Sequence, residues 1–210
     1  MEIQSNLGQS IAPEQILGYL RKSDYLNTKY TGPDWFTLGW HRFAAAAASE
    51  FDEFLREVTS EWKWYSTKPK FDRNKALFEL VDWFLFTASA IHCTNIINGL
   101  DGADIELESF HGHVTYTGMM NRGLPLMERL LVAESECRVA TFIKGLGIAG
   151  SIKTVCVFLD LALELIGATP ANFDEAYQFK YQTNLNRVAG GILTGGAYRK
   201  EDEVYPEILA

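Results

Sequence analysis

The chain has 210 residues, of which 47% are hydrophobic and 22% charged, a balance typical of one folded domain with a substantial core. Its formal net charge of −8 disfavours non-specific binding to nucleic acid, because the phosphate backbone would repel it. Three widely spaced cysteines form neither a disulfide framework nor a metal-ligand pattern. We see no secretion signal and no apolar stretch suited to crossing a membrane. We therefore expect one cytoplasmic domain over residues 1–210, with neither a membrane nor a nucleic-acid partner.

Helical patterns run through most of the chain, and no convincing alternation of strand residues interrupts them. A first helix over 12–24 has Pro13 at a tolerated early position, and a turn follows at 31–34. About five main helices are expected after it, over 35–60, 72–98, 125–144, 151–166 and 172–188. The predicted fold class is therefore all-α, a helical bundle.

Several segments have features beyond the helical pattern. The alanine run at 44–48 has high helix propensity, and its small side chains should let another helix come close. Ser151 is the expected N-cap of a helix that Gly167 ends. A polar stretch with several glycines, 100–124, is predicted to be a loop insertion, and the tail over 189–210 is predicted to be mobile.

The strongest physical signal is a pair of acids in the helix over 72–98. Between Ala76 and Ile91 the only charged residues are Glu79 and Asp82, and a helix that is apolar nearly all round is a buried one. The spacing of three places both carboxylates on the same face. Two ionised acids there repel each other and lose solvation, which is costly unless a cation compensates. Mg²⁺ suits that role because it prefers carboxylate oxygens.

The helix over 35–60 carries a second acid pair with the same spacing, Glu50 and Glu53. Two helices that each offer two acids can face each other across a bundle and hold divalent metals between them. No histidine stands at the spacing of a di-iron site, so we expect Mg²⁺, with Mn²⁺ as an alternative. Two other interpretations stay open: a solvated acidic face, and an ion pair between an acid and a buried Arg or Lys.

The helix over 172–188 carries a stripe of polar side chains. Tyr177, Lys180, Asn184 and Arg187 follow one another at offsets of three, four and three, which places them on one face. Arg can bind phosphate oxygens through a fork and Lys as a point charge. The alternative is a solvated amphipathic helix whose basic residues have no function.

Between the two acid pairs lies the aromatic sequence Trp62-Lys63-Trp64-Tyr65. Trp and Tyr side chains can stack on a nucleobase, and Lys63 could reach a phosphate. From composition alone, a place in the core or at a dimer interface is an equally good interpretation.

In this order, the motifs resemble those of the dimeric dUTPases and the related phage dCTPase-dUTPases, which are all-α NTP pyrophosphatases. The blocks that carry the resemblance are Leu26-Asn27 with Pro33-Asp34-Trp35, then Glu50-x-x-Glu53, Trp62-Lys63-Trp64-Tyr65 and Glu79-Leu-Val-Asp82, and finally Tyr177-x-x-Lys180-x-x-x-Asn184-x-x-Arg187. The chain departs from the family pattern at two places. Asp24 stands where the family often has Gln, and Val188-Ala-Gly-Gly-Ile follows Arg187 where the family tends to continue Gln-x-x-Gly-Tyr. These departures concern base selectivity and closure over the substrate, not the metal ligands.

The resemblance implies a homodimer that hydrolyses dUTP to the monophosphate and pyrophosphate, with dCTP and dUDP as further candidate substrates. It implies that the metal ligands are Glu50, Glu53, Glu79 and Asp82. A metal-bound water, deprotonated with help from Glu50 or Glu53, would attack the α-phosphorus. The implied substrate-binding residues are Asn27 and Trp62 near the base and sugar, and Lys180, Asn184 and Arg187 near the phosphates. Two further candidates for substrate binding are Asp24, which stands at the family's Gln position, and Lys63 of the aromatic block.

Two other functions stay open. The first is the same chemistry on another or modified deoxynucleotide, because the carboxylate of Asp24 accepts hydrogen bonds where Gln can also donate them. The second is a non-catalytic helical binding protein on the same scaffold, such as an inhibitor. The presence of all four acids argues against this second function.

Overall fold

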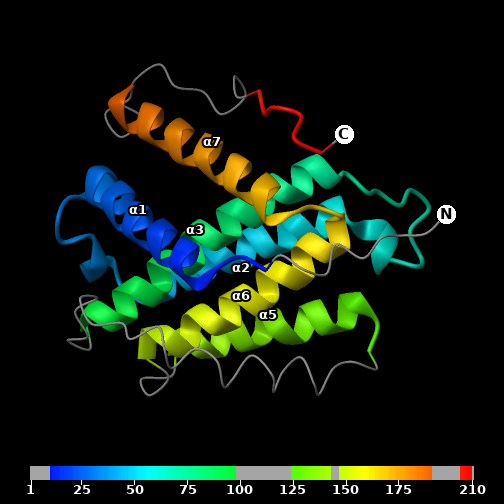
Figure 1. Cartoon of the computed structure of the whole chain (residues 1–210), viewed down its shortest axis with the longest axis horizontal. Helices are drawn as coiled ribbons and strands as arrows, with labels where there is room; N and C mark the ends of the chain where they lie inside the picture. Colours follow the sequence, from blue (N-terminus) through cyan, green and yellow to red (C-terminus); the bar gives the residue numbers. More distant parts are fainter. Residues whose placement is uncertain (1–9, 98–123, 143–146, 191–203, 210) are drawn as a thin grey trace.

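The computed structural model describes residues 10–97, 124–142, 147–190 and 204–209 (Figure 1). Within these ranges the chain forms six α-helices, two short 3-10 helices and no strand, which confirms the predicted all-α fold. In chain order the elements are α1 (Pro13–Thr31), η1 (Trp35–Leu38), α2 (Trp40–Glu57), η2 (Thr59–Glu61), α3 (Arg73–Ile97), α5 (Leu126–Phe142), α6 (Gly147–Ile166) and α7 (Pro170–Ala189).

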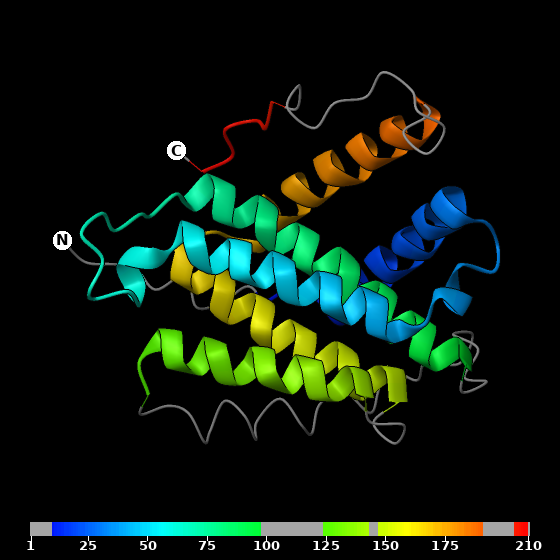
Figure 2. The same ribbon diagram turned by 180° about the vertical axis from the view of Figure 1, so that it is seen from behind.

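The central element of the bundle is α3, which contacts each of the other five α-helices. Its most extensive partner is α2, which runs alongside it (Figure 2). On one side of this pair lie α1 and α7, and on the other lie α5 and α6, which pack mainly on each other (Figures 1 and 2). Three segments far apart in the sequence, α1, α3 and α7, therefore meet along one side of the bundle.

Apolar side chains cover α3 nearly all round, as its sequence predicted. Phe78, Trp83 and Phe84 are almost fully buried, and aromatic rings from other helices, such as Phe158 and Phe173, pack against them. By length and composition alone, residues Arg73–Thr94 are long and apolar enough to cross a membrane, which we did not expect from the sequence. Of this stretch's most apolar window, 78% is buried inside the bundle, which is the environment of a core helix.

The expectation of one continuous helix over 35–60 is wrong, because Gly39 separates η1 from α2. Gly39 has a φ of 85°, a backbone conformation that favours glycine because a Cβ atom would be strained there. Its N–H donates a hydrogen bond to the carbonyl of Phe36 and ends η1. The break lets Trp35 turn inward against Phe43 and His92 while α2 follows α3.

Two further helix starts differ from the sequence prediction. Ser151 is not an N-cap, because α6 begins at Gly147 and Ser151 lies buried inside the helix. The cap of α7 is Thr169: its hydroxyl accepts the N–H of Asn172, and the Asn172 side chain accepts the N–H of Thr169. Gly167, with a φ of 63°, ends α6 as expected.

The two irregular segments predicted from the sequence lie mostly outside the described residues. Of the predicted insertion over 100–124, only Leu124 is described, and 191–203 of the predicted mobile tail are not described. Residues 204–209, however, contact α3 and α7. Leu209 is only 8% exposed, and the ring of Tyr205 stacks on Phe78.

The alanine run lies on α2, whose contact with α3 is the most extensive between any two helices of the described residues, and it also borders a cavity. Four of its five alanines line a cavity of about 330 Å³ between α2, α3 and α5, together with Trp40 and Trp83. Glu134 of α5 also lines the cavity, and its carboxylate accepts a 2.5 Å hydrogen bond from Arg138. Burial raises the pKa of the Glu134 carboxyl above its ordinary 4.5, although Arg138 partly offsets the shift.

Alanine substitutions at two glycines should have opposite effects on the stability of the protein, because one glycine has a strained backbone conformation and the other does not. Gly39→Ala should destabilise the protein by about 1–2 kcal/mol, because the positive φ is unfavourable for an L-residue and the new Cβ would lie 2.6 Å from the His41 ring. Gly18→Ala, inside α1 with no atom within 4 Å of the new Cβ, should stabilise it by about 0.5–1 kcal/mol. Urea unfolding measures both. Equal effects of the two changes would contradict the strain at Gly39.

The buried Glu134 should make stability fall as pH rises. A carboxyl whose pKa is higher in the folded than in the unfolded state favours folding while it is protonated, and this advantage is lost from pH 4.5 up to the raised pKa. Glu134→Gln should therefore gain stability relative to the wild-type protein as pH rises through that window. Unfolding free energies measured across the window test this, with the exposed Glu128→Gln on α5 as a control that should show no such gain.

Candidate metal centre

Three carboxylates from two helices converge at the boundary between α2 and α3. Glu50 and Glu53 lie one turn apart on α2, and Glu79 lies on α3. One carboxylate oxygen from each of the three lies within 4.8 Å of the others, and all three side chains are half-buried. The structure therefore brings together three of the four acids that the sequence singled out.

The connection between α2 and α3, residues 58–72, sets this geometry. Backbone hydrogen bonds join its two sides, from Ser60 N–H to the Lys70 carbonyl and from Asp72 N–H to the Glu57 carbonyl. An ion pair between Lys70 and Glu57 adds to them. The connection thus folds the chain back on itself, so α2 and α3 lie alongside each other with their acids at the shared seam.

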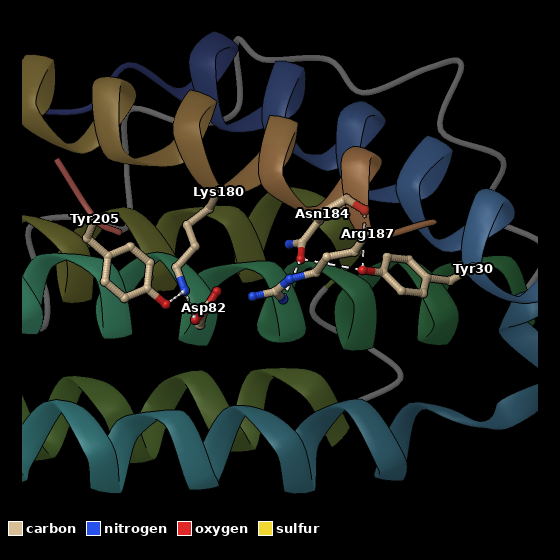
Figure 3. Close-up of polar contacts among 6 residues, drawn as sticks. All are labelled: Tyr30, Asp82, Lys180, Asn184, Arg187 and Tyr205. Carbon is tan, nitrogen blue, oxygen red and sulfur yellow. Dashed lines mark hydrogen bonds and ion pairs between the residues drawn. The ribbon is translucent and has the colours of Figure 1, made fainter. Parts of the chain in front are cut away.

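Asp82, the fourth predicted ligand, is not part of this three-acid group. Its carboxylate instead pairs with the ammonium of Lys180 on α7 (Figure 3). For Asp82, the structure therefore shows the alternative raised by the sequence, an ion pair with a buried Lys. Because Asp82 lies three residues after Glu79, the ion pair is about one helical turn from the cluster.

Lys180 is only 2% exposed, and both of its partners are fixed in the fold. Its ammonium donates to Asp82 and to the hydroxyl of Tyr205, 3.0 Å away (Figure 3). Burial on its own would lower the pKa of Lys180, but the charge of Asp82 and the contact with Tyr205 outweigh it, so the pKa is raised. Lys180 is therefore a buried cation at neutral pH.

The other members of the polar stripe on α7 also face inward. Asn184, 8% exposed, accepts a 2.8 Å hydrogen bond from Arg187 through its side-chain oxygen. The hydroxyl of Tyr30 on α1 donates to the backbone carbonyl of Asn184 at 3.3 Å (Figure 3). Tyr177 is fully buried, and its hydroxyl donates to the carbonyl of Tyr19. The alternative of a solvated amphipathic face is thus wrong for this stripe.

Asp24 and Asn27 on α1 are held by neighbouring elements rather than by the acid cluster. The indole N–H of Trp35 donates to the Asp24 carboxylate at 2.9 Å, and His92 Nε2 lies 3.8 Å from the same oxygen. Asn27 donates to the hydroxyl of Ser89 at 2.8 Å. Both residues, which were predicted to bind the base, therefore lie on the side of α1 that faces the second half of α3.

The aromatic block lies at the surface of the connection between α2 and α3. Trp64 is 91% exposed, which excludes a core position for it. Trp62 is 37% exposed, and its indole N–H donates to the carbonyl of Leu55. The ammonium of Lys63 lies 5.9 Å and 5.6 Å from the ring centres of Trp62 and Tyr65, within reach of cation–π attraction.

The donor atoms of the cluster match a hard divalent cation. Three half-buried carboxylates within 4.8 Å repel one another when ionised, and a cation between them would remove that cost. Carboxylate oxygens suit Mg²⁺ or Mn²⁺, whereas zinc and iron sites normally include His or Cys. Within the described ranges, this is the one group of three or more His, Cys, Asp or Glu side chains close enough to share an ion.

Comparison with known proteins adds no relative. No known protein family matches the chain, and no curated protein is similar to it. The resemblance to dimeric dUTPases therefore rests on the motif residues alone and stays a prediction.

Two residues of the site carry no signal in the sequence. Tyr205 lies in a short segment without helical or strand periodicity, 25 positions after the lysine that it contacts. Tyr30 lies 154 positions before Asn184, near the end of α1. Both are found only when the chain is folded, because no local pattern connects them to α7.

Magnesium should stabilise the folded protein through the cluster. At a free concentration of one hundred times the dissociation constant, the gain is about 2.7 kcal/mol, or a rise in melting temperature of roughly 5–10 °C for a chain of this size. Glu53→Gln should remove most of that rise, because it takes one charge from the cluster. The matched control is Asp52→Asn, since Asp52 neighbours Glu53 but pairs with Arg56 at the exposed face of α2. An equal magnesium response in all three proteins would exclude the cluster as the site.

Proposed function

We propose that this chain is a magnesium-dependent nucleoside triphosphate pyrophosphatase that acts on dUTP, with dCTP and dUDP as further candidate substrates. The observation that carries the proposal is the convergence of Glu50, Glu53 and Glu79 beside the buried cation Lys180. Acids that can hold Mg²⁺, next to cationic and amide groups that can bind phosphate oxygens, are what the hydrolysis of a triphosphate requires.

In this proposal the acids bind the metal ion and the stripe on α7 binds the phosphates. Glu50, Glu53 and Glu79 would hold Mg²⁺, which supplies charge neutralisation on the phosphates and a lowered pKa for water. Glu50 or Glu53 would accept the proton of the attacking water. As the water oxygen bonds to the α-phosphorus, the bond to the bridging oxygen of the β-phosphate breaks and pyrophosphate leaves.

The stripe on α7 would bind the departing phosphates. Lys180 would exchange Asp82 for phosphate oxygens, which frees Asp82 to join the metal ligands. Arg187 and Asn184, already bonded to each other, would present a fork and an amide to the same chain of phosphates. Lys63, on the connection between α2 and α3, would add a positive charge near the phosphates. The homodimer and the cytoplasmic location stay predictions.

Two observations favour competing functions. Asp24 accepts a hydrogen bond from Trp35, and an acceptor at this position also suits a base other than uracil. The ion pair between Lys180 and Asp82 engages one of the four acids, which suits a non-catalytic binding protein on the same scaffold. The alternatives are therefore a pyrophosphatase for another or modified deoxynucleotide, and a helical binding protein without activity.

A substrate panel tests all three functions together. Pyrophosphate release is measured from dUTP, dCTP, dTTP, dATP and dGTP, each with magnesium and with EDTA. We expect magnesium-dependent release from dUTP, or from dUTP and dCTP. Release from a different base would keep the mechanism and change the substrate, and no release from any of the five would favour the binding protein.

Glu79→Gln should abolish turnover while the helical fold persists. The change keeps the shape of the side chain but removes one of three charges from the cluster, and the expected loss is roughly a hundredfold or more, since even outer-shell partners of a metal are worth 10–100-fold. Pyrophosphate release measures turnover, and circular dichroism measures helix content. Glu164→Gln, at an exposed position of α6, is the control. Retained activity in Glu79→Gln would remove this residue from the metal site.

A further inference from the structure

The segment 204–209 is fastened to the start of α3 by one side chain, that of Asn74. The amide N–H of Asn74 donates to the carbonyl of Pro206 at 2.9 Å, and its oxygen accepts from the N–H groups of Ile208 and Leu209 at 2.9 and 3.3 Å. The side chain of Leu209 is buried in the core. These six residues, which form neither helix nor strand, thus lie between the start of α3 and α7, at the edge of the bundle (Figure 1).

These contacts fix the position of Tyr205. Its ring stacks on Phe78 of α3, with 4.5 Å between ring centres and 22° between planes, and the edge of Phe179 of α7 packs nearby. Two helices and the Asn74 contacts therefore orient the phenol. Its hydroxyl lies 3.0 Å from the ammonium of Lys180, which also lies 4.6 Å from the ring centre (Figure 3).

Lys180 consequently has two partners of different kinds. Asp82 is an acid that a metal ion can also bind, whereas Tyr205 is not one of the candidate metal ligands. A buried ammonium that lost Asp82 without a second partner would carry a large desolvation cost. With Tyr205 in place, the ammonium keeps one hydrogen bond and stays beside the acid cluster.

We propose that Tyr205 is a positioning residue, which holds the Lys180 ammonium at the edge of the acid cluster so that it meets the phosphate chain of the substrate. This inference deepens the proposed function and rests on it. The segment 204–209 is then part of the phosphate-binding site, although none of its own side chains needs to touch the substrate.

Tyr205→Phe is the direct test, because it removes the hydroxyl and keeps the stacked ring. We expect KM for the hydrolysed nucleotide to rise roughly tenfold, the fold-change that corresponds to about 1.4 kcal/mol, while kcat stays nearly unchanged. A contact that binds ground state and transition state alike affects KM in this way. The control is Tyr181→Phe, which removes a hydroxyl from the neighbouring position on α7 and should leave KM unchanged. A merely structural role would lower stability without this split between KM and kcat.

A second pair of variants tests whether the effect passes through Lys180. In a Lys180→Met background, Tyr205→Phe should raise KM no further, because the hydroxyl then has no ammonium to hold. Asn74→Ala, which releases the segment at three hydrogen bonds, should raise KM at least as much as Tyr205→Phe. Calorimetric binding of inorganic triphosphate in the presence of Mg²⁺ gives the same comparison without turnover, with an expected tenfold weaker binding in Tyr205→Phe.

The outcomes separate the two proposals. Hydrolysis with the same KM, and triphosphate binding with the same affinity, in wild type and Tyr205→Phe would overturn the positioning role alone. A KM increase that persists in the Lys180→Met background would also overturn it, because the effect would not depend on Lys180. Neither hydrolysis nor triphosphate binding by the wild-type protein would overturn the proposed function, and this inference with it.

Discussion

The rest of this structure depends on one constraint: α3 is a core helix with an apolar surface, yet it carries ionised carboxylates. Each such charge costs several kcal/mol unless a cation compensates it. On α3 the two acids solve the problem differently: Asp82 pairs with a cation of the protein, Lys180, whereas Glu79 lies among two further acids of α2. The ion pair of Asp82 lies within the chain, whereas the three-acid group could also hold a cation from solution.

The inward face of α7 follows from the same constraint. A buried lysine needs its own partners, and the fold supplies them from distant segments: Asp82 from α3 and Tyr205 from the segment after α7. Asn184 and Arg187 are bonded to each other, with Tyr30 of α1 adding a contact. The polar seam between α3 and α7 therefore holds two groups of hydrogen bonds in an otherwise aromatic interior, one around Lys180 and one around Asn184, and within each group the members help to orient one another.

The parts of the site that the sequence could predict are those that obey a local period. A spacing of three or four on a helix places side chains on one face, so the acid pairs and the stripe on α7 followed from Glu50, Glu53, Glu79 and Lys180 alone. The partner of Asp82 could not be predicted, because it lies 98 positions away. Tyr205 was missed because an extended segment has no such period.

Backbone conformation explains the errors in the helix boundaries. Between Trp35 and Ser60 the helical pattern is continuous by composition, but the positive φ of Gly39 interrupts the helix, and α2 ends at Glu57. Helix propensity also indicated that residues 44–48 form a helix, but it could not reveal the cavity beside them. Such errors did not affect the prediction of the all-α class, because that prediction depends on the helical pattern of many segments and not on the exact ends of any one helix.

The sequence separation of Asp82 and Lys180 also determines the order in which the site assembles. The two acid-bearing helices are neighbours in the chain and can pair as soon as both have left the ribosome, whereas Lys180 follows Asp82 by 98 residues. At common rates of synthesis this delay is about 5–20 s. During that interval Asp82 lacks the ammonium of Lys180 as its partner. The ion pair between α3 and α7 is therefore one of the last contacts of the site that can form as the chain is synthesised.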